Sequence, residues 1–261
     1  MRIATWNVNS IRARLDRVDE WLEGMQPDVC CFQETKVADA AFPAERFVER
    51  GYEVAHHGDG RWNGVAIASR VGLADVVRGF CGDAGVEGAE PRLISATCGG
   101  VRVMSVYVPN GRSIESEHFA AKLAFLRRLR EHLDDSCNPE GAAVLCGDFN
   151  VAPTDMDVFD PAHFEGSTHV TAEEREALAN VLGFGLVDVL RAAYPDTPGL
   201  FSWWDYRAGD FHAGRGMRID LILATRILAA AVGSALVDRN ARKGQQPSDH
   251  APVVIDVNYP C

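Results

Sequence analysis

The sequence predicts an α/β fold in which two β-sheets pack face to face and helices cover their outer faces. Short segments rich in Val and Ile recur along the whole chain, with the apolar or alternating pattern of strands. Longer segments with the periodicity of amphipathic helices lie between them. Gly-rich turns join several of the strand segments. Hairpins mixed with helices in this way are typical of a layered α/β fold.

Nine segments are predicted as strands, and each is short and either apolar or alternating. In chain order they are Arg2–Val8, Asp28–Glu34, Tyr52–His57, Gly64–Ser69, Arg92–Cys98, Val101–Val108, Ala142–Phe149, Ile219–Leu223 and Ala251–Val257. The turn Cys98-Gly-Gly-Val101 predicts that the strands on either side of it form a hairpin.

Three segments are predicted as helices. Ile11–Glu23 has an apolar face formed by Ile11, Leu15, Val18 and Leu22. Ile114–Leu133 has an apolar face formed by Phe119, Leu123, Leu126 and Leu133, and its basic side chains are expected elsewhere: Lys122, Arg127, Arg128 and Arg130. We interpret the arginines as a solvated helix face and not as a DNA contact. A third helix is expected to run to Leu182 from a capping box formed by Thr171 and Glu174.

The chain is expected to form one domain covering residues 1–261, because it contains no repeat, linker or low-complexity tract. No apolar run approaches the ~20 residues of a membrane helix, and the first residues lack the pattern of a signal peptide. We therefore expect a cytoplasmic monomer that does not bind membranes. Cys30, Cys31 and Cys146 lie in apolar runs, so we expect buried, reduced thiols and neither zinc nor disulfides.

The net charge of −11, from 37 acidic and 26 basic residues, argues against binding nucleic acid through a broad basic surface. A small basic rim around an acidic site could still hold phosphates. The charge alone therefore decides little, and the polar motifs must identify the site.

Polar side chains that are costly to bury follow the first two predicted strands. Asn7 and Asn9 are two residues apart at the end of the first strand, so we expect them on one face. Glu34 ends the second strand after an almost continuous apolar run, where a helix cap or a turn is the competing interpretation. Both strands thus deliver metal-binding or phosphate-binding groups to their carboxyl ends.

The segment Val144–Asn150 repeats this pattern. An apolar strand leads to Gly147, whose missing side chain permits a close backbone approach, and then to Asp148 and Asn150 at alternate positions. A β-turn is the alternative, because all three residues favour turns.

The last candidates lie near the C-terminus. Asp220 interrupts an otherwise buried strand, which is unfavourable unless the carboxylate has a partner. His250, which directly follows Asp249, is a suitable partner because a carboxylate fixes its tautomer and raises its pKa. The other histidines show no ligand spacing and are treated as background.

Carboxylates, amides and one histidine dominate this set, and no cysteine belongs to it. Oxygen ligands favour Mg²⁺ or Mn²⁺ over zinc. A metal, a general base and groups that orient a phosphate are the parts needed to hydrolyse a phosphodiester with water.

The chain contains a series of motifs that together resemble the exonuclease III family of apurinic/apyrimidinic (AP) endonucleases, within the endonuclease/exonuclease/phosphatase superfamily. These motifs are Trp6–Arg12, Gln33–Lys36, Tyr107–Asn110, Gly147–Asn150, Trp203–Arg207, Arg218–Asp220 and Ser248–His250. The resemblance spans residues 2 to about 257. It implies a four-layer α/β sandwich of the DNase I type, in which two mixed sheets are flanked by helices.

The resemblance also implies roles for single residues. Glu34 resembles the principal ligand of a Mg²⁺ ion, and Mn²⁺ could substitute for Mg²⁺. Asn7 and Asp249 would lie in or near the metal's coordination shell. Asp148 would orient and deprotonate the attacking water with help from Asn150, and both could also reach the metal.

The same resemblance assigns groups to the scissile phosphate. His250, paired with Asp220, would hold this phosphate and stabilise its developing charge. Tyr107 would contact it as nucleophile, as leaving-group acid or as a simple donor, and the resemblance does not choose among these roles. Asn110 would lie close by.

Substrate contacts are expected from two further groups. An apolar pocket for a base-free sugar would be formed by Trp203, Met217 and Ile219, which select by size, whereas Trp204 is expected to be a core residue. A small basic rim would bind double-stranded DNA with abasic sites, nicks or recessed 3′ ends. Its candidate residues, Arg12, Lys36, Arg112 and Arg207, lie near the motifs.

The chain departs from the family pattern at two positions. Ser10 stands where many relatives carry Gly and is expected to stiffen the first catalytic loop. Met217 stands where relatives carry Leu or Trp, and its flexible side chain is expected to loosen the selection of abasic sites.

Other functions remain as alternatives. An inositol-phosphate or sphingomyelin phosphodiesterase would share the metal and histidine chemistry but not the Trp203–Arg207 and Arg218–Asp220 motifs. A secreted DNase I-like nuclease would be expected to have disulfides. A catalytically inactive phosphate-binding module would have lost a carboxylate or the histidine, and all are present. The sequence therefore predicts a DNA repair phosphodiesterase with AP endonuclease and 3′-exonuclease activities.

Overall fold

The computed structural model describes residues 1–83 and 89–259 and contains two six-stranded mixed sheets. The first sheet has the order β11-β12-β1-β2-β4-β3, from Val232–Val237, Val253–Val257, Arg2–Asn7, Val29–Gln33, Val65–Ser69 and Glu53–His57. The second sheet has the order β5-β6-β7-β8-β10-β9, from Ala74–Arg78, Leu93–Cys98, Val101–Tyr107, Ala143–Asp148, Asp220–Thr225 and Leu186–Asp188.

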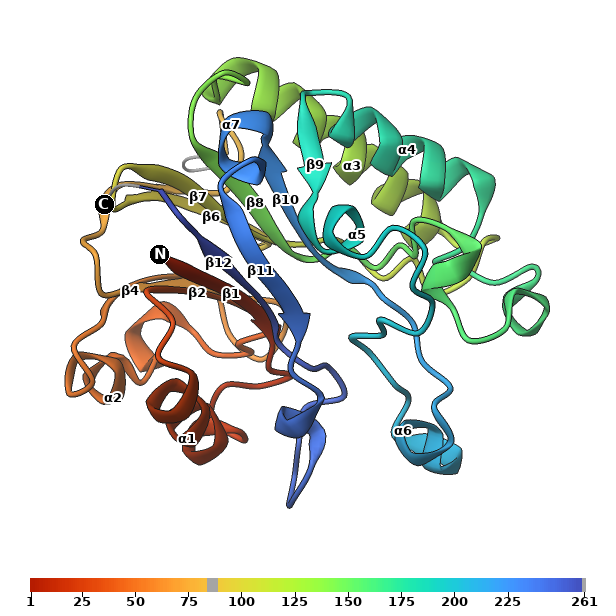
Figure 1. The fold of residues 1–261 in the computed structure, drawn as a ribbon, viewed down its shortest axis with the longest axis horizontal. Coiled ribbons are helices and arrows are strands. Elements are labelled where there is room, and N and C mark those ends of the chain that lie inside the picture. The colour runs from red at the N-terminus through yellow and green to blue at the C-terminus, as the bar shows by residue number, and fades with distance from the viewer. Residues whose placement is uncertain (84–88, 260–261) are drawn as a thin grey trace.

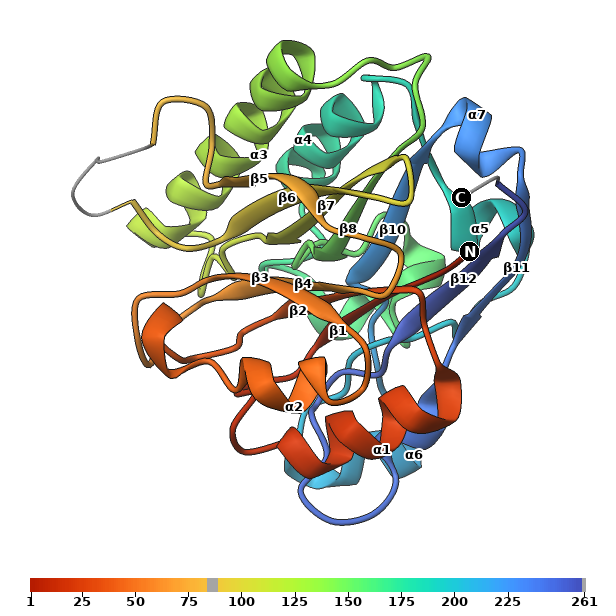
Figure 2. The same cartoon turned by 90° about the vertical axis from the view of Figure 1, so that its left-hand side faces the viewer.

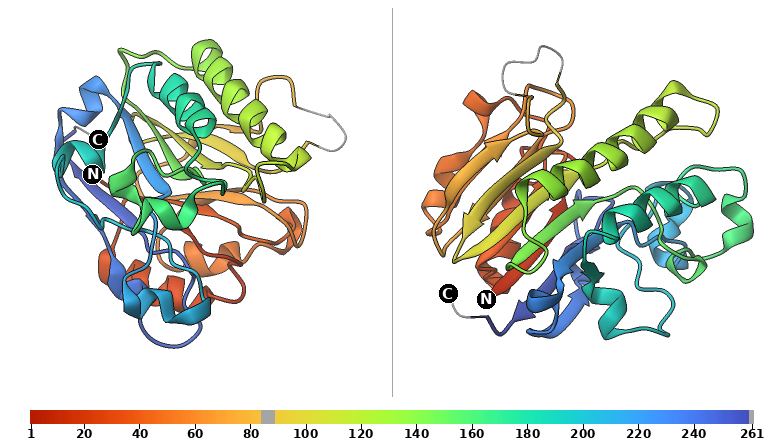
Figure 3. Two further views of the ribbon diagram at one scale, coloured as in Figure 1. Left: turned by 90° about the vertical axis from the view of Figure 1, so that its right-hand side faces the viewer. Right: turned by 90° about the horizontal axis from the view of Figure 1, so that it is seen from above.

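The sheets pack face to face, and helices cover both outer faces (Figure 1, Figure 2). Helices α1 (Leu15–Met25) and α2 (Ala44–Val48) lie on the first sheet, and α3 (Glu117–Ser136) lies beside α4 (Ala172–Leu182) on the second (Figure 3). Three apolar clusters fill the spaces between these four layers. The four-layer sandwich expected from the sequence is confirmed.

Three shorter α-helices complete the described fold: α5 (Val189–Ala193), α6 (Asp210–Ala213) and α7 (Arg226–Ala229). Several single 3₁₀ turns accompany them. Among the described residues, no helix combines the length and the apolar composition needed to cross a membrane. Cys30, Cys31 and Cys146 are buried and unpaired, as expected. Trp204 is fully buried and is a core residue, as expected.

Two predicted helices begin later than expected. The first starts at Leu15 and not at Ile11, because the amides of Ser10 and Ile11 donate to the carbonyl groups of Glu34 and Thr35. The second starts at Glu117 and not at Ile114, because the hydroxyl of Ser116 caps it. The third starts at Ala172 behind the predicted capping box, with both of its hydrogen bonds present.

Lys122 is the clearest error in the helix analysis. The sequence placed it away from the apolar face of α3, but its side chain is fully buried. Its position is four residues before Leu126 and seven before Leu129, so it lies on the buried stripe of this helix. Leu123, predicted on that face, is only half-buried.

Three strands of the structure were not predicted from the sequence. β5 and β11 are edge strands that bury little side-chain surface, and β9 has three residues, so their apolar patterns are weak. The strand predicted at Ile219–Leu223 runs instead from Asp220 to Thr225. The hairpin predicted at Cys98-Gly-Gly-Val101 is confirmed, since Cys98 pairs with Val101 between antiparallel β6 and β7.

Candidate active site

Strand pairing brings three of the predicted site residues into one row of the second sheet. Asp148 ends β8, where it is in register with Tyr107 of parallel β7 and Asp220 of antiparallel β10. Residues in register project their side chains from the same face of a sheet. The inner face of the second sheet therefore presents two carboxylates and a phenol at one edge.

Gly147 makes this arrangement possible. Its φ of +152° is in a region that other residues rarely adopt, and a Cβ built there would lie 1.9 Å from the carbonyl oxygen of Val106. The close backbone approach expected from the sequence is present. Any side chain at this position would push β8 away from β7 and displace Asp148.

Asn7 connects this row to the first sheet. Its amide Nδ2 donates to Oε1 of Glu34 at 2.9 Å and to Oδ2 of Asp148 at 2.9 Å, so one side chain links carboxylates from both sheets. Asn7 ends β1, which pairs with β2 in parallel and thereby lies beside the strand that leads to Glu34. Its Oδ1 accepts from the amide of Asn9 at 3.0 Å.

Asn9 does not share a face with Asn7, contrary to the prediction. β1 ends at Asn7, and Asn9 has a φ of +44°, which turns the chain out of the strand. Its Nδ2 donates to Oδ1 of Asp249 at 3.0 Å. The other carboxylate oxygen of Asp249 accepts from Nε1 of Trp203 at 3.2 Å. Despite burial, His250 and these two hydrogen bonds lower the pKa of Asp249.

Asn150 meets Asp148 through a turn and not through strand alternation. β8 ends at Asp148, and Asn150 has a φ of +51°. Its backbone amide donates to Oδ1 of Asp148 at 2.9 Å, and its Nδ2 donates to the carbonyl group of Val108 at 2.9 Å. The predicted strand therefore holds through Asp148, and only Asn150 leaves it, yet the two side chains still meet.

His250 and Asp220 form the pair that the sequence predicted. Nδ1 of His250 lies 2.8 Å from Oδ2 of Asp220, which also accepts from the hydroxyl of Ser202 at 2.6 Å. The other ring nitrogen, Nε2, lies 3.8 Å from Oδ2 of Asp148. The ring is therefore placed between two carboxylates from neighbouring strands.

These contacts shift the pKa values of both groups. Burial alone would lower the pKa of His250, but the charges of Asp220 and Asp148 outweigh burial and raise this pKa to about 10. Burial raises the pKa of Asp148 to about 7, with Asp220 and Glu34 adding to the increase and His250 opposing it. Near neutral pH, His250 is thus a cation and Asp148 is close to its titration point.

A cation would find a suitable set of ligands here. Carboxylate oxygens of Glu34 and Asp148 and a ring nitrogen of His250 lie within 4.8 Å of one another. Because His250 is a cation, the two carboxylates are the ligands that this cluster could offer. Glu34 is half-buried, and Nζ of Lys36 lies 2.8 Å from its Oε2. Two carboxylates and neighbouring amide oxygens are hard donors, which fit Mg²⁺ or Mn²⁺. Asp249, also expected near the metal, instead contacts Asn9 and Trp203.

Tyr107 stands beside this cluster, half-buried. Burial, followed by the charges of Glu34 and Asp148, raises the pKa of its phenol well above the ordinary value. The Arg92 guanidinium lies over the ring, 4.7 Å from its centroid. The phenol therefore stays protonated at neutral pH and can donate a hydrogen bond.

His169 belongs to the site, although the sequence analysis treated it as background. Its Nε2 lies 3.1 Å from Oδ1 of Asn150 and 3.2 Å from Nδ2 of Asn110. Burial and the charge of Lys122 lower its pKa to about 4, so the ring is neutral near pH 7. Ser202 was also missed, although it receives the amide of Asp220 and donates to its carboxylate. No spacing in the sequence indicated either residue, because both reach the site from distant loops.

The backbone around the site is unusual. Several residues other than glycine have left-handed backbone angles, which cost on the order of 1 kcal/mol each and persist only where the surroundings enforce them. They are Asn9, Ser10, Glu34, Lys36, Arg112, Asn150 and His169. Ser10, which departs from the family pattern, has a φ of +90°, a conformation that would suit glycine.

The predicted basic rim is dispersed. Arg12 is exposed and donates to the carbonyl group of Ala41, whereas Arg207 is exposed and paired with Asp205. Lys36 is already committed to Glu34. Arg112 is exposed, and in the described part of the chain its guanidinium has no hydrogen-bond partner.

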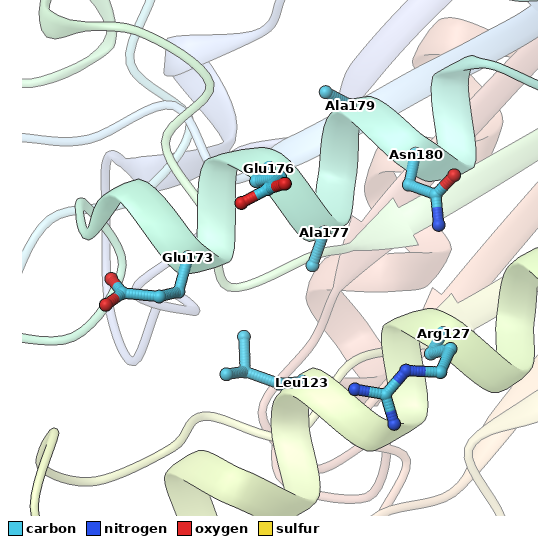
Figure 4. A pocket seen from close by; sticks show the side chains of 7 residues that line it. All are labelled: Leu123, Arg127, Glu173, Glu176, Ala177, Ala179 and Asn180. Carbon is cyan, nitrogen blue, oxygen red and sulfur yellow. The ribbon is translucent and has the colours of Figure 1, made fainter.

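Arg112 lies in a groove next to the active site. Tyr107, Asn110, Arg92, Trp62 and Asn63 also line this groove. Trp62 was not singled out in the sequence, although 65% of its surface is exposed. A second hollow, between α3 and α4, is lined by Leu123, Arg127 and the Glu173–Asn180 face of α4, and it contains none of the predicted site residues (Figure 4).

The residues predicted to form the sugar pocket lie in one apolar cluster. Met217 and Ile219 are buried and pack with Ala152, Val158 and the half-buried Trp203. The backbones of Trp203 and Met217 also form an isolated bridge. Trp203 is the only one of the three predicted residues that is open to solvent, so it is the one placed to meet a ligand directly.

The two packed sheets, the carboxylates and the cationic histidine define a hydrolase of the phosphodiesterase class. A family model described as the endonuclease/exonuclease/phosphatase family matches residues 4–250. The chain belongs to this family, in the exonuclease III branch that the motifs indicated. Its activity is that of a DNA repair phosphodiesterase.

Known proteins of this branch resemble the chain over nearly its full length. Exodeoxyribonuclease III of Haemophilus influenzae is 34% identical, and the match covers 97% of this chain and 98% of that protein. The structure of an AP endonuclease from Archaeoglobus fulgidus is 40% identical, with a TM-score of 0.94 and coverage of 99% and 100%. A Neisseria 3′ phosphatase bound to a product DNA hairpin is 37% identical, with a TM-score of 0.95 and the same coverage.

Proposed function

We propose that the chain uses Mg²⁺ to hydrolyse the DNA backbone 5′ to abasic sites and to remove 3′-terminal nucleotides or blocking groups. The observation that carries this proposal is the gathering of the Glu34 and Asp148 carboxylates and the His250 ring within 4.8 Å where the two sheets meet. The proposed catalytic unit is a monomer formed by one domain. We keep the cytoplasm as its expected compartment.

Glu34 is proposed as the main metal ligand, with Asp148, Asn150, Asn7 and Asp249 in or near the shell. Mg²⁺ bound there would supply Lewis-acid stabilisation of the phosphoryl oxygen. Asn7 would keep the Glu34 and Asp148 carboxylates in place through the hydrogen bonds of its amide. Lys36 would neutralise Glu34 until a cation arrives.

Asp148 is proposed as the general base. A pKa raised to about 7 places this carboxylate near the pH at which it can both lose and accept a proton, which favours general-base catalysis. Its Oδ1 is held by the Asn150 amide, so the water would meet an oriented carboxylate. The side chain of Asn150 would support the same water.

His250 is proposed to hold the scissile phosphate. Asp220 accepts from Nδ1, so the Nε2–H of the cationic ring can donate to a phosphoryl oxygen as its negative charge develops. Tyr107, which keeps its proton, is proposed as a second donor to the same phosphate and not as a nucleophile. Asn110 would complete the set of donors from the loop after β7.

The DNA duplex is proposed to cross the site along the groove of Arg112, with Arg12, Lys36 and Arg207 as further phosphate contacts. Trp203, with Met217 and Ile219 behind it, is proposed as the wall of a pocket that admits a base-free sugar by size. Because Met217 and Ile219 are buried, they would act mainly through the position of Trp203.

The test is a side-by-side assay at fixed Mg²⁺ on three duplexes: one with an abasic site, one with a recessed 3′ end and one with a 3′-phosphate nick. We expect cleavage of all three, and no release of phosphate from inositol phosphates. Hydrolysis of inositol phosphates without nicking of DNA would overturn the proposal.

The pocket is tested by Trp203→Ala. Loss of one wall in an apolar pocket is worth only a few kcal/mol, so abasic-site cleavage should weaken while phosphodiester hydrolysis on intact 3′ ends persists. Met217→Trp should narrow the pocket and change the ratio of abasic-site cleavage to hydrolysis at intact 3′ ends. A parallel loss of both activities in both variants would mean that these residues support the fold and do not select the substrate.

A further inference from the structure

Lys122 lies in the interior beneath the active site, and its side chain is fully buried. It projects from α3 toward α4, where Glu174 is also fully buried, and the two form an ion pair. The helices that carry them face each other directly, as the neighbouring residues Leu123 and Glu173 show (Figure 4). We propose that Lys122, held by Glu174, is a positioning residue for the amides of Asn110 and Asn150.

The contacts of the ammonium group carry this proposal. Nζ of Lys122 donates to the carbonyl oxygen of Asn150 at 2.6 Å and to that of Asn110 at 3.3 Å, and it also reaches the hydroxyl of Thr168 at 3.2 Å. Asn110 follows β7, Asn150 follows β8, and Thr168 precedes His169. One cation therefore joins three loops whose side chains meet in the active site.

Glu174 fixes the direction of this cation. Its Oε1 accepts from the hydroxyl of Thr168 at 2.6 Å and from the amide of His169 at 2.9 Å, in addition to Lys122. Its Oε2 accepts from the amide and the hydroxyl of Thr171 at 3.1 and 2.8 Å. The carboxylate is thus fully hydrogen-bonded and cannot turn without breaking several bonds.

Stability alone is a weak reason for such a pair. Taking two charges out of water costs about as much as their attraction returns, and apolar residues of similar volume often stabilise a core as well or better. A fully bonded buried pair does fix geometry, because each hydrogen bond defines a direction. Here the defined directions end on the backbones of two residues in the active site.

The side chains of Asn110 and Asn150 are positioned together with their backbones. Nδ2 of Asn110 donates to Oδ1 of Asn150 at 3.2 Å, and the backbone amide of Asn150 donates to Asp148. A shift of either backbone would move the amides away from the general base and the phosphate. The inference rests on the proposed roles of Asn110 and Asn150, and it deepens them.

The chain offers a control in a partly buried ion pair between the two helices that cover the first sheet. Asp19 of α1 is buried and pairs with Arg46 and Arg50, with Nε of Arg50 at 3.0 Å from its Oδ1. Asp19→Asn removes a buried charge from a helix contact on the first sheet. It should lower the melting temperature without changing the kinetics of the folded enzyme.

The experiment compares Lys122→Met with Asp19→Asn in the full chain, on the duplex that the parent enzyme cleaves best. For Lys122→Met we expect kcat to fall about 10- to 100-fold while KM changes by less than about 3-fold, because chemistry and not binding is affected. In the Asn150→Ala background the same substitution should have a smaller effect than in the parent, because only the contribution through Asn110 remains. Thermal unfolding of each variant measures the folded fraction independently of activity.

Because Lys122→Met leaves Glu174 as an unpaired buried charge, it could unfold the protein. The double variant Lys122→Met/Glu174→Gln removes both charges and keeps the fold testable. A folded double variant with parental kcat would overturn the inference, as would full additivity with Asn150→Ala. If the parent itself fails to cleave DNA, the proposed function is wrong, whereas an active parent with an indifferent Lys122 refutes only this inference.

Discussion

The two sheets support their halves of the active site in different ways. On the first sheet, Thr35 next to Glu34 contacts His56 through Oγ1 and Nε2 at 2.8 Å, and Nδ1 of His56 lies 2.8 Å from Asp39. Burial lowers the pKa of His56 to about 4, so its ring is neutral at pH 7. The series of contacts that supports Glu34 therefore contains a neutral histidine. On the second sheet, the corresponding support is the buried ion pair of Lys122 and Glu174.

A second buried network strengthens this contrast. Arg218, just before Ile219 and Asp220, is fully buried between Asp157 and Asp188 at 2.7 Å each. The loops that carry Asn110, Asn150 and Asp220 are thus held by buried ion pairs, whereas the loop of Glu34 is held by a buried neutral histidine. His56 therefore adds a dependence on pH to the metal-binding half.

The largest expected effect concerns the second-sheet half. Asp148→Asn keeps the shape and the hydrogen bond from Asn150 but removes the proton acceptor. General-base catalysis is worth roughly 10²–10⁴-fold, so kcat should fall by that factor while binding to duplex DNA persists or tightens. Single-turnover cleavage and a binding titration at matched Mg²⁺ measure the two quantities. A variant that cleaves at nearly the parental rate would end the assignment of Asp148 as the base.

Next in size is a change in the first-sheet half. Glu34→Gln removes a charged ligand, so the Mg²⁺ concentration for half-maximal activity should rise by at least ~10-fold, with partial recovery in Mn²⁺. Glu53→Gln, at an exposed position on β3, is the matched control and should titrate like the parent. If Glu34→Gln responds to Mg²⁺ as the parent does, the main metal ligand lies elsewhere, and the first sheet does not carry the metal-binding half of the site.

In the sequence, Asp148 ends an apolar strand and Asp220 interrupts another, whereas Tyr107 was expected from the family resemblance. Strand registration then brings Tyr107, Asp148 and Asp220 together without further information. The local backbone was less predictable, since Asn9 and Asn150 leave their strands through left-handed conformations that no strand pattern indicates. A polar residue after a strand thus predicts membership in a site better than it predicts the direction of a side chain.

The supporting residues were missed for another reason. His169 and His56 join the site through contacts between distant segments, and their local sequences resemble ordinary loops and strands. Glu174 was named only as the capping residue of α4, and its contact with Lys122 was not foreseen. Lys122 alone left a signal, because it occupies a position on the buried stripe of α3. A lysine at a core position of one helix, together with a glutamate on a neighbouring helix, predicts a buried ion pair.

A smaller effect should appear in the pH dependence of stability. The pKa of His56 is about 4 in the folded protein and about 6.5 in the unfolded chain. Between these values the unfolded state binds more protons, so stability is complete above pH 6.5 and is lost as the pH falls toward 4. The contribution of His56 to this loss is about 2 kcal/mol between pH 8 and pH 5.

Urea unfolding at the two pH values tests this difference. His56→Gln should lose about 2 kcal/mol less than the parent on acidification, whereas His118→Gln, at an exposed position, should behave like the parent. The other histidines with lowered pKa values, His57, His132 and His169, stay in both proteins and cancel in the comparison. If the parent and His56→Gln lose the same free energy of unfolding on acidification, His56 does not titrate as proposed.

The smallest expected effect separates DNA contacts from solvated charge. Arg112 lies in the groove beside Tyr107, whereas Arg127 lies in the hollow between α3 and α4, away from the predicted site residues (Figure 4). Each phosphate contact contributes roughly −0.9 to the slope of log K against log salt for duplex DNA. Arg112→Ala should make this slope shallower by about that amount and weaken binding uniformly across sequences, whereas Arg127→Ala should leave it unchanged.

The parental slope itself should be shallow, because the net charge of −11 leaves only a few contacts. A slope approaching ~−10, as for a repressor with many phosphate contacts, or an equal effect of the two substitutions, would show that the basic surface is broader than the groove and that α3 takes part in it.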